Sequence, residues 1–389
     1  MTLSNSVRLL DRHGRPYGYD VKGGPRWQLP HTPHFSRDAF AAAHVVADAA
    51  RMQHPTRDMA IDWDATLAYR RHLMSLGFGV AEAMDTAQRG MGLDWPTSLM
   101  LIQRSVAQAK DFPGAAIACG AGTDHLTSFS GLTLTDVINA YEQQIEAIEA
   151  CGGRIILMAS RALAAIARGP EDYLRVYDRV LQQVREPVIL HWLGEMFDPA
   201  LRGYWGAAPL NDAMEICLAV IERNEAHVDG IKISLLDKDR EIAMRRRLPG
   251  RVKMYTGDDF NYPELIAGDS QGYSHALLGI LDAIAPAASA ALHALAQGDR
   301  ETYQQILAPT LPLARHIFAA PTHYYKAGIV FLAWLNGHQN HFTMLGGMQS
   351  ARSLGHYSEL FRLADEAGLL VNPELASERM GVLGRLHGI

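Results

Sequence analysis

The chain has 389 residues, of which 48% are apolar, 20% charged and 8% aromatic, and its formal net charge is −6. This composition is typical of a folded globular enzyme and excludes a disordered chain, which would carry few apolar residues and many charges. The mild excess of acidic residues also argues against a nucleic-acid-binding protein, because such proteins present a basic face.

From the amino terminus, residues 1–38 predict an irregular arm, and eight short apolar runs that predict buried strands follow it. These runs span Ala39–Val46, Gly79–Met84, Ala115–Cys119, Arg154–Ala159, Pro187–Leu193, Gly230–Leu235, Val252–Thr256 and Gly272–Leu278. Amphipathic helical patterns lie between most of them, at Trp63–Leu76, Pro96–Ala109, Leu134–Ala150, Glu171–Arg185 and Asn211–Arg223. Alternating strands and helices indicate a parallel sheet, and eight repeats predict an α/β fold of the (β/α)8 TIM-barrel type.

The residues that follow the last predicted strand form a helical extension. Helical patterns occur there at Ala287–Ala296, Glu301–Ala319, His323–Asn336 and Tyr357–Ala367. We therefore predict three parts in the chain: the arm over residues 1–38, the barrel over residues 39–286, and a C-terminal helical region over residues 287–389 that packs on the barrel.

The three cysteines, Cys119, Cys151 and Cys217, are far apart and form no C-x-x-C pair, which favours a reducing compartment over a disulfide scaffold. The amino-terminal residues lack the apolar core of a signal peptide, and no apolar run reaches the roughly 18 residues that a membrane span needs. We expect a cytoplasmic protein that acts on a small molecule and has neither a nucleic-acid nor a membrane partner.

In a (β/α)8 barrel the side chains that act on the substrate lie at the carboxyl ends of the strands, where the loops form the pocket. Lys232 is the most informative candidate, because it lies inside the almost wholly apolar segment Asp229–Leu236. Burial in such a strand lowers the pKa of a lysine and makes its amine a nucleophile that can form a Schiff base with a carbonyl. Alternatively, Lys232 pairs with Asp258 or Asp259 after the next strand and serves the architecture alone.

His191 ends the preceding strand, and adjacent parallel strands lie about 4.8 Å apart, so we expect it to be a neighbour of Lys232. A histidine there is suited to move the protons of Schiff-base chemistry, or else it is bonded by the backbone in the pocket wall. The polar residues that we expect to bind substrate are Glu82, Asp85, His125, Arg161, Asp258 and His275. Some of these carboxylates and histidines could hold a divalent metal, and Arg161 could clamp a carboxylate or phosphate or form a structural ion pair.

The segment Gly230-Ile-Lys-Ile-Ser234, with Pro187-Val-Ile-Leu190 one strand earlier and Tyr255-Thr-Gly-Asp258 one strand later, resembles the dihydrodipicolinate synthase and N-acetylneuraminate lyase superfamily. The likeness covers residues 115–300, and the sequence is most similar to a branch of the superfamily described only as a domain of unknown function. The resemblance implies a (β/α)8 barrel with C-terminal helices and Lys232 as the Schiff-base lysine. It also implies a pyruvate-type or other keto substrate and a homo-oligomer, a dimer or tetramer.

Two departures from the family pattern favour a different substrate. The family's proton-relaying tyrosine on the fifth strand is replaced by His191, and its carboxylate-gripping Gly-Thr-Thr-Gly-Glu is replaced by the segment Glu82–Gln88. We therefore predict a lyase, an aldolase or hydro-lyase, that forms a Schiff base with a keto-sugar or a sugar-derived keto acid and requires no cofactor. The alternatives are a metal-dependent sugar isomerase or epimerase on the same barrel, and a barrel that binds a ligand without catalysis.

Overall fold

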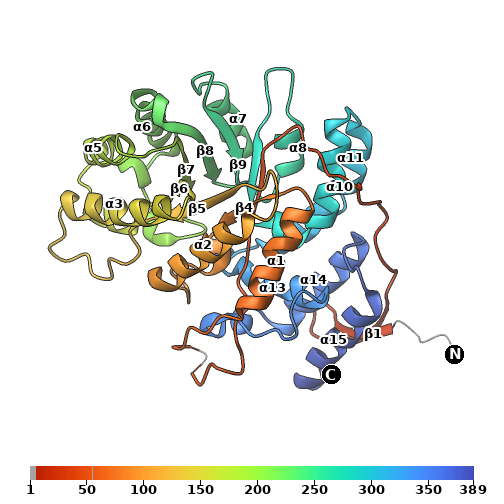
Figure 1. Ribbon diagram of the computed structural model, residues 1–389. Helices are drawn as coiled ribbons and strands as arrows, with labels where there is room; N and C mark the ends of the chain where they lie inside the picture. Colours follow the sequence, from red (N-terminus) through yellow and green to blue (C-terminus); the bar gives the residue numbers. More distant parts are fainter. Residues whose placement is uncertain (1–5, 55) are drawn as a thin grey trace. The chain divides into compact units, whose positions relative to one another are not determined.

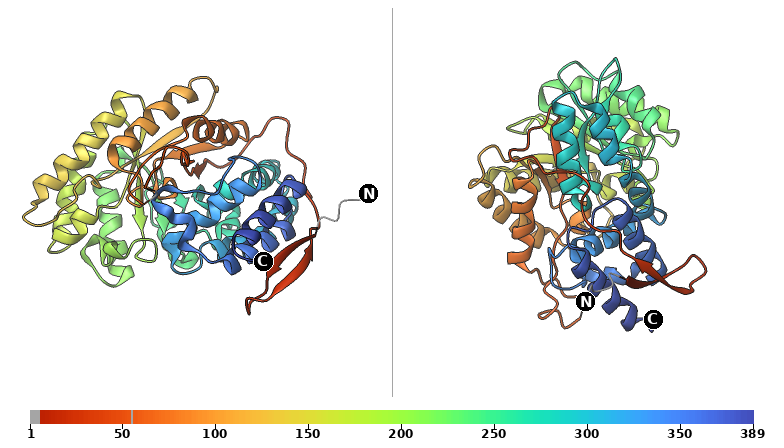
Figure 2. Two further views of the ribbon diagram at one scale, coloured as in Figure 1. Left: turned by 90° about the horizontal axis from the view of Figure 1, so that it is seen from below. Right: turned by 90° about the vertical axis from the view of Figure 1, so that its right-hand side faces the viewer.

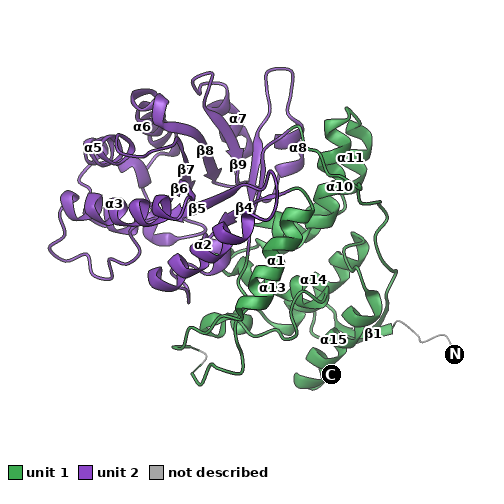
Figure 3. Cartoon of the chain, viewed as in Figure 1, with its two compact units in different colours: residues 1–36, 44–77, 279–389 green, residues 37–43, 78–278 purple. Residues whose placement is uncertain are grey.

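The computed structural model describes residues 6–54 and 56–389, and the chain divides into two compact units that are coloured separately in Figure 3. Unit 2 comprises residues 37–43 and 78–278, and unit 1 comprises the described parts of residues 1–36, 44–77 and 279–389. The three-part division at residues 38 and 286 stays a prediction, and its first five residues lie outside the described residues.

Unit 2 contains a closed barrel of eight parallel strands, which follow one another around the barrel in chain order (Figure 1). The strands are β3 (Ala39–Ala42), β4 (Gly79–Glu82), β5 (Ile117–Ala121), β6 (Arg154–Leu157), β7 (Val188–Leu193), β8 (Val228–Ser234), β9 (Lys253–Thr256) and β10 (His275–Leu278). The barrel closes where β10 pairs with both β9 and β3. The predicted (β/α)8 fold is confirmed, and each predicted apolar run overlaps one of these strands.

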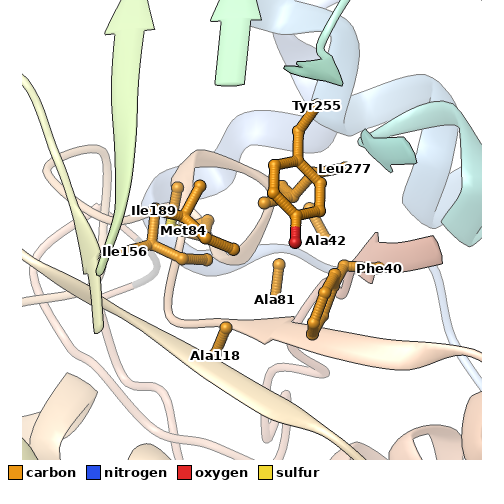
Figure 4. Packing of buried hydrophobic residues seen from close by; sticks show 9 residues of the cluster. All are labelled: Phe40, Ala42, Ala81, Met84, Ala118, Ile156, Ile189, Tyr255 and Leu277. Carbon is orange, nitrogen blue, oxygen red and sulfur yellow. The ribbon is translucent and has the colours of Figure 1, made fainter. Parts of the chain in front are cut away.

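The barrel interior is filled by side chains that the strands present on alternate residues, as the two-residue period of a strand requires. Figure 4 shows this buried cluster, in which small side chains such as Ala81 and Ala118 leave room for Phe40 and Tyr255. The Phe40 and Tyr255 rings lie 6.2 Å apart, centre to centre, in an edge-on arrangement that aromatic pairs favour. The interior is therefore a packed core, and a pocket can form only above it.

Seven helices connect the strands of unit 2. They are α2 (Trp95–Ala109), α3 (Leu134–Ala150), α4 (Arg161–Ile166), α5 (Pro170–Leu181), α6 (Leu210–Arg223), α7 (Lys238–Arg245) and α8 (Tyr262–Ala267), with short 3-10 turns η1 (Asp85–Ala87), η2 (Pro199–Leu201), η3 (Tyr204–Gly206) and η4 (Glu225–His227). The start of α3 is set by a capping box, in which Thr133 and Asp136 bond each other's backbone N–H groups. This signal is local, which explains why the predicted bounds of α3 agree with the structure.

Unit 1 begins with a hairpin of β1 (Ser6–Leu10) and β2 (Pro16–Asp20), drawn in red in Figure 2. Its helices are α1 (Trp63–Ser75), α9 (Ile280–Ala283), α10 (Ala285–Ala296), α11 (Arg300–Leu307), α12 (Thr310–Ile317), α13 (Tyr325–Leu335), α14 (Leu354–Glu366) and α15 (Pro373–Leu386), with 3-10 turns η5 (Thr322–Tyr324) and η6 (Leu345–Ala351).

Two predictions for unit 1 need correction. The arm is not wholly irregular, because a turn with Gly14 in the left-handed region (φ 75°) closes the β1–β2 hairpin. The helix predicted over Glu301–Ala319 is two helices, α11 and α12, because Pro309 between them lacks the N–H that a continuous helix needs.

Two global features concern the cysteines and the membrane. All three cysteines are free thiols, and burial raises the pKa of Cys119 and Cys217, which keeps these two thiols protonated. No helix within residues 6–54 and 56–389 combines the length and the apolar character that crossing a membrane requires.

Candidate active site

Lys232 lies within β8 with only 7% of its surface exposed. The strand register places it level with His191 on β7 and with Tyr255 on β9. Its ammonium group forms no hydrogen bond or salt bridge with any described residue. Lys232 is therefore a buried amine without a direct charged partner, which is a costly arrangement for an ammonium ion.

The pKa of Lys232 is lowered from its ordinary value. Burial is the main cause, and the carboxylates of Asp259 and Asp85 oppose it by favouring the charged form. The two carboxylates do not fully offset burial, so the neutral amine is more accessible than in an exposed lysine. A neutral amine is the form that attacks a carbonyl carbon.

Asp258, one of the two carboxylates considered as a structural partner of Lys232, bonds its own turn instead. Its carboxylate accepts hydrogen bonds from Phe260 N at 2.8 Å and from Asn261 N and Nδ2 at 3.0 and 2.9 Å. Burial raises the pKa of Asp258, and these bonds act against that rise. Asp258 thus closes the loop after β9 and does not pair with Lys232.

His191 is 1% exposed, and one of its two ring nitrogens has a hydrogen-bond partner. Its Nε2 lies 3.2 Å from Ser234 Oγ, whereas its Nδ1 is buried and has no partner within the described residues. Burial, and then the charge of Lys232, hold the pKa of His191 well below its ordinary value. The imidazole is therefore neutral near pH 7, with one ring nitrogen free to exchange a proton.

A pocket of about 310 Å³ opens at the carboxyl ends of β4, β5, β6 and β7, which is a size suited to a small molecule. Its polar lining residues are Asp85, Arg89, Thr123, Asp124, Thr127, Arg161, Asp198 and His191, and its larger apolar ones are Leu126, Phe129, Met158, Leu193 and Leu201. Lys232 is not among the lining residues, whereas its neighbour His191 is. No group of three or more His, Cys, Asp or Glu side chains in the described ranges is arranged to hold a metal ion.

Arg89 braces one wall of the pocket and was not foreseen from the sequence. Its buried guanidinium donates to both carboxylate oxygens of Asp124, at 2.7 and 3.1 Å, and also bonds Gln144 and the carbonyl of Gly120. Burial raises the pKa of Asp124, but the charge and hydrogen bonds of Arg89 outweigh it and lower that pKa. Arg89 therefore ties the loops after β4 and β5 together. Nothing local in the sequence marks this pairing, because the two residues lie far apart along the chain.

Arg161 forms the structural ion pair considered for it and also lines the pocket, so its role as a clamp for a substrate stays a prediction. Its Nε donates to Asp198, which anchors the side chain, and its guanidinium lines the pocket with 41% of the side chain exposed. Neither Nη1 nor Nη2 has a hydrogen-bond partner within residues 6–54 and 56–389. These two nitrogens form a planar pair of donors that suits a carboxylate or several hydroxyl oxygens.

Asp85 and His125 differ in their relation to the pocket. Asp85 begins η1 and lines the pocket. His125 is only partly buried and lies 2.8 Å, through Nδ1, from Gln144 Nε2, and burial lowers the pKa of its imidazole. His125 is next to the lining residue Asp124 but does not itself line the pocket.

Glu82 lies away from the pocket, contrary to its predicted contact with substrate. Its fully buried carboxylate accepts from Ala83 N at 2.8 Å and from Ser105 Oγ on α2 at 2.5 Å. Ala81 faces the barrel core, so the next residue along the strand faces the surrounding helices. We correct the prediction accordingly: Glu82 joins β4 to α2.

His275 also lies away from the pocket, because it is the first residue of β10 and not the last. Its Nδ1 accepts a hydrogen bond from Asp38 N at 2.8 Å, at the amino end of the barrel. Lys253, at the start of β9, pairs with Asp38 and with Asp229 in the same network. The predicted strand Gly272–Leu278 ends at the same residue as β10, so His275 was selected although it lies before the carboxyl end of the strand. The amino-terminal face of a barrel, where His275 lies, serves stability.

The sequence matches one described protein family over almost its whole length. The family is described as "Protein of unknown function (DUF993)", and the match covers residues 7–389. The chain belongs to the DUF993 family. No curated protein matches it.

The fold of this DUF993 chain is similar to solved dihydrodipicolinate synthase structures. A putative dihydrodipicolinate synthetase from Pseudomonas aeruginosa aligns with a TM-score of 0.61 and 16% identity, over 87% of this chain and 99% of its own. Dihydrodipicolinate synthase from Aquifex aeolicus aligns with a TM-score of 0.64 and 12% identity, over 86% and 99% of the two chains. A prophage protein of this family from E. coli K12, in complex with pyruvate, aligns with a TM-score of 0.63 and 13% identity, over 91% and 99%.

At these identities the likeness establishes the fold of the DUF993 chain and leaves its chemistry to its own residues. The resemblance inferred from Lys232 and its flanking strands is confirmed at the level of fold. Sequence reasoning missed Arg89 and Asp198 as pocket residues, since neither lies at the end of a predicted strand. In the sequence they are an arginine and an aspartate in loops, and many other residues of this chain have the same character.

Proposed function

We propose that this protein is a Schiff-base-forming lyase in which Lys232 attacks the carbonyl of a keto-sugar or a sugar-derived keto acid. The observation that carries the proposal is the buried position of Lys232, level with His191 and without a salt-bridge partner among the described residues. A lysine that served only the architecture would be expected to pair with a carboxylate, and Asp258 is engaged elsewhere.

The reaction begins with the neutral Lys232 amine and the substrate carbonyl. A C–N bond forms, the carbonyl oxygen takes up the two amine protons and leaves as water, and a C=N bond remains. When this imine is protonated, it withdraws electrons from the neighbouring carbon, so that a C–C or C–O bond one position further on can break. His191 is the group proposed to move protons, because it is neutral, buried and has a free Nδ1.

The substrate class follows from the pocket lining. Asp85 suits substrate hydroxyl groups, and the free Nη groups of Arg161 suit hydroxyl or carboxylate oxygens. Phe129 and Met158 offer an apolar wall for a carbon chain. His125 bonds Gln144, which in turn bonds the lining residue Asp124, so His125 would act on a substrate only indirectly. This chemistry needs no metal or other cofactor. That two similar structures, from Acinetobacter baumannii and E. coli K12, are complexes with pyruvate supports a keto compound.

Borohydride trapping tests the proposal. The protein is incubated with a panel of keto-sugars and keto acids, reduced, digested and mapped by mass spectrometry. We expect a stable adduct on Lys232 with at least one compound, and loss of that adduct and of turnover in both Lys232→Ala and Lys232→Arg. Lys238, which is exposed and paired with Glu264, provides the control variant Lys238→Ala. Activity that survives Lys232→Ala, or a panel that never labels this residue, would disprove the proposal.

The assembly state stays a prediction. A homo-oligomer is expected from the resemblance, although one similar structure is described as a monomeric dihydrodipicolinate synthase variant. Sedimentation equilibrium of the purified chain measures this directly, and a single species at the mass of one chain would contradict the expectation.

A further inference from the structure

Ser234 lies close to both residues of the proposed reaction. It is the last residue of β8, two positions after Lys232, so both side chains lie on the same face of the strand. Its side chain is buried, with 2% of the residue exposed, and its hydroxyl lies 3.2 Å from His191 Nε2. Among the described residues, this histidine is the hydroxyl's one hydrogen-bond partner.

Gly257, after β9, allows the Ser234 hydroxyl and the end of the Lys232 side chain to occupy the same small space. A β-carbon added to Gly257 would collide with Ser234 Oγ and would lie 2.8 Å from Lys232 Cε. The two side chains therefore approach a common point from β8, and only a glycine at residue 257 leaves that point free. This is a second observation, independent of the His191 contact, that places the hydroxyl beside the lysine.

We propose that the Ser234 hydroxyl relays a proton between Lys232 Nζ and His191 Nε2 during imine formation. The proposal rests on the proposed function, because it assigns a role within the same reaction. Ser234 acts through its neighbours and does not contact the substrate, so it is a positioning and relay residue and not a catalytic one.

In the proposed relay, each proton that is released has an acceptor. When the amine attacks, the nitrogen becomes positive and the carbonyl oxygen negative. No hydrogen bond joins Lys232 Nζ to Ser234 Oγ in the structure, so the relay requires the end of the lysine side chain to turn toward the hydroxyl within the space beside Gly257. The nitrogen then gives one proton to Ser234 Oγ, the serine gives its own proton to His191 Nε2, and His191 gives its Nδ1 proton to the oxygen. The carbinolamine is then neutral, Ser234 is unchanged, and the histidine has passed from its Nδ1–H to its Nε2–H tautomer. Exchange with water in the pocket then resets the histidine tautomer. The second proton of the nitrogen follows the same path to the oxygen, which leaves as water.

Acetylacetone is a suitable probe because a 1,3-diketone forms a stable, ultraviolet-absorbing enaminone with a neutral lysine amine, whatever the natural substrate is. We expect Ser234→Ala to form the same Lys232 adduct as the unaltered protein, but about 100-fold more slowly. Ser234→Cys keeps a weak proton donor and acceptor at this position and should lie between the two rates. Ser98→Ala removes a buried hydroxyl that has no partner in the described residues, and it should leave the rate unchanged.

A double-mutant comparison separates a relay from a packing role. If Ser234 and His191 act in one path, His191→Gln and Ser234→Ala should slow adduct formation by similar factors, and the double variant should be no slower than His191→Gln alone. Both variants should also lose the same limb of the pH–rate profile. Losses that multiply, or a Ser234→Ala rate equal to the unaltered rate, would disprove the relay while the Lys232 adduct still formed. If the unaltered protein formed no adduct at all, the relay and the proposed function would both be wrong.

Discussion

At the scale of single residues, Lys232 differs from the other lysines in its surroundings. Lys238 and Lys253 form salt bridges with Glu264, Asp38 and Asp229 at the surface of unit 2. Lys326 is also buried, but its Nζ donates to a backbone carbonyl at 3.0 Å. The chain supplies most of its positive charge with arginine, which cannot lose a proton under ordinary conditions and cannot form an imine. The environment of Lys232, together with its residue type, is what favours a chemical role.

The pH dependence of Lys232 labelling is a prediction at this scale. The rate of adduct formation should rise with pH through the Lys232 pKa, which lies below 10.5. Asp85→Asn removes a carboxylate that raises this pKa, so the midpoint should move further toward lower pH. The acetylacetone rate, measured from pH 6 to about pH 10, checks the shift. An unchanged or higher midpoint in Asp85→Asn would show that this carboxylate does not act on the amine.

Gly257→Ala tests the space shared by Ser234 and Lys232. The new methyl group would lie 2.6 Å from the Ile233 carbonyl oxygen and 2.8 Å from Lys232 Cε, so the strand or the lysine must move. We expect a loss of about 1–3 kcal/mol in the free energy of unfolding and slower labelling of Lys232. Gly250→Ala is the matched control, because its methyl group meets no atom within 4 Å. Equal stability of the two variants would contradict the crowding described for Gly257.

At the scale of secondary-structure elements, the alternation of each strand determines which polar residues reach the site. Lys232 and Ser234 share one face of β8, whereas Glu82 lies on the helix-facing side of β4. Sequence reasoning selected polar residues near strand ends without applying this alternation, and it therefore included Glu82. The loops contribute the remaining pocket residues, and their conformation depends on contacts between different βα units, such as the one between Arg89 and Asp124.

Replacing Arg89 should weaken the wall that this contact builds. Arg89→Met leaves the mostly buried Asp124 carboxylate without its cation, and we expect a loss of about 3 kcal/mol in the free energy of unfolding. The double variant Arg89→Met/Asp124→Leu removes the unpaired charge and should recover part of that loss. Denaturant unfolding at pH 7 measures both. A double variant that is less stable than the single one would show that the two residues do not act as a pair.

At the scale of the whole molecule, unit 1 carries a buried group of histidines that the proposed chemistry does not use. His44 Nδ1 lies 2.8 Å from an Asp282 oxygen, and the rings of His72 and His338 lie 4.5 Å apart. Burial, followed by the charges of His72 and His44, lowers the pKa of His338 to about 4. Burial also lowers the pKa of His72. Because their pKa values are lowered, His338 and His72 are packed in their neutral forms, so acid must destabilise the unit that contains them.

The sign of this effect is fixed by the direction of the shifts. The unfolded chain takes up a proton at His338 near pH 6.5, whereas the folded chain does so only near pH 4, so stability should fall as the pH drops through this interval. The loss from this residue should reach about 3 kcal/mol below pH 4. Across this pH range, the melting temperature of His338→Gln should fall less than that of the unaltered chain. The control variant His31→Gln replaces an exposed histidine, and its melting temperature should fall as much as that of the unaltered chain. A His338→Gln curve parallel to that of the unaltered chain would contradict the assignment.

Much of the architecture could be predicted because its signals are local. The eight apolar runs and the caps of helices such as α3 are written in short stretches, and the order of strands around the barrel follows the order of the chain. Elements with weak or interrupted periodicity were missed, including the β1–β2 hairpin, α15 and the break between α11 and α12. For the site, the position of Lys232 beside His191 was predictable, since both follow from neighbouring strands.

The sequence by itself determined the barrel, the family resemblance and the unusual place of one lysine in an apolar strand, because each depends on residues close together along the chain. Only the tertiary structure decided that Ser234 reaches His191, that Arg89 binds Asp124, and that Glu82 and His275 lie away from the pocket. Those outcomes depend on strand register, barrel closure and loop packing. They bring together groups that are distant in sequence, and no local pattern encodes such distances.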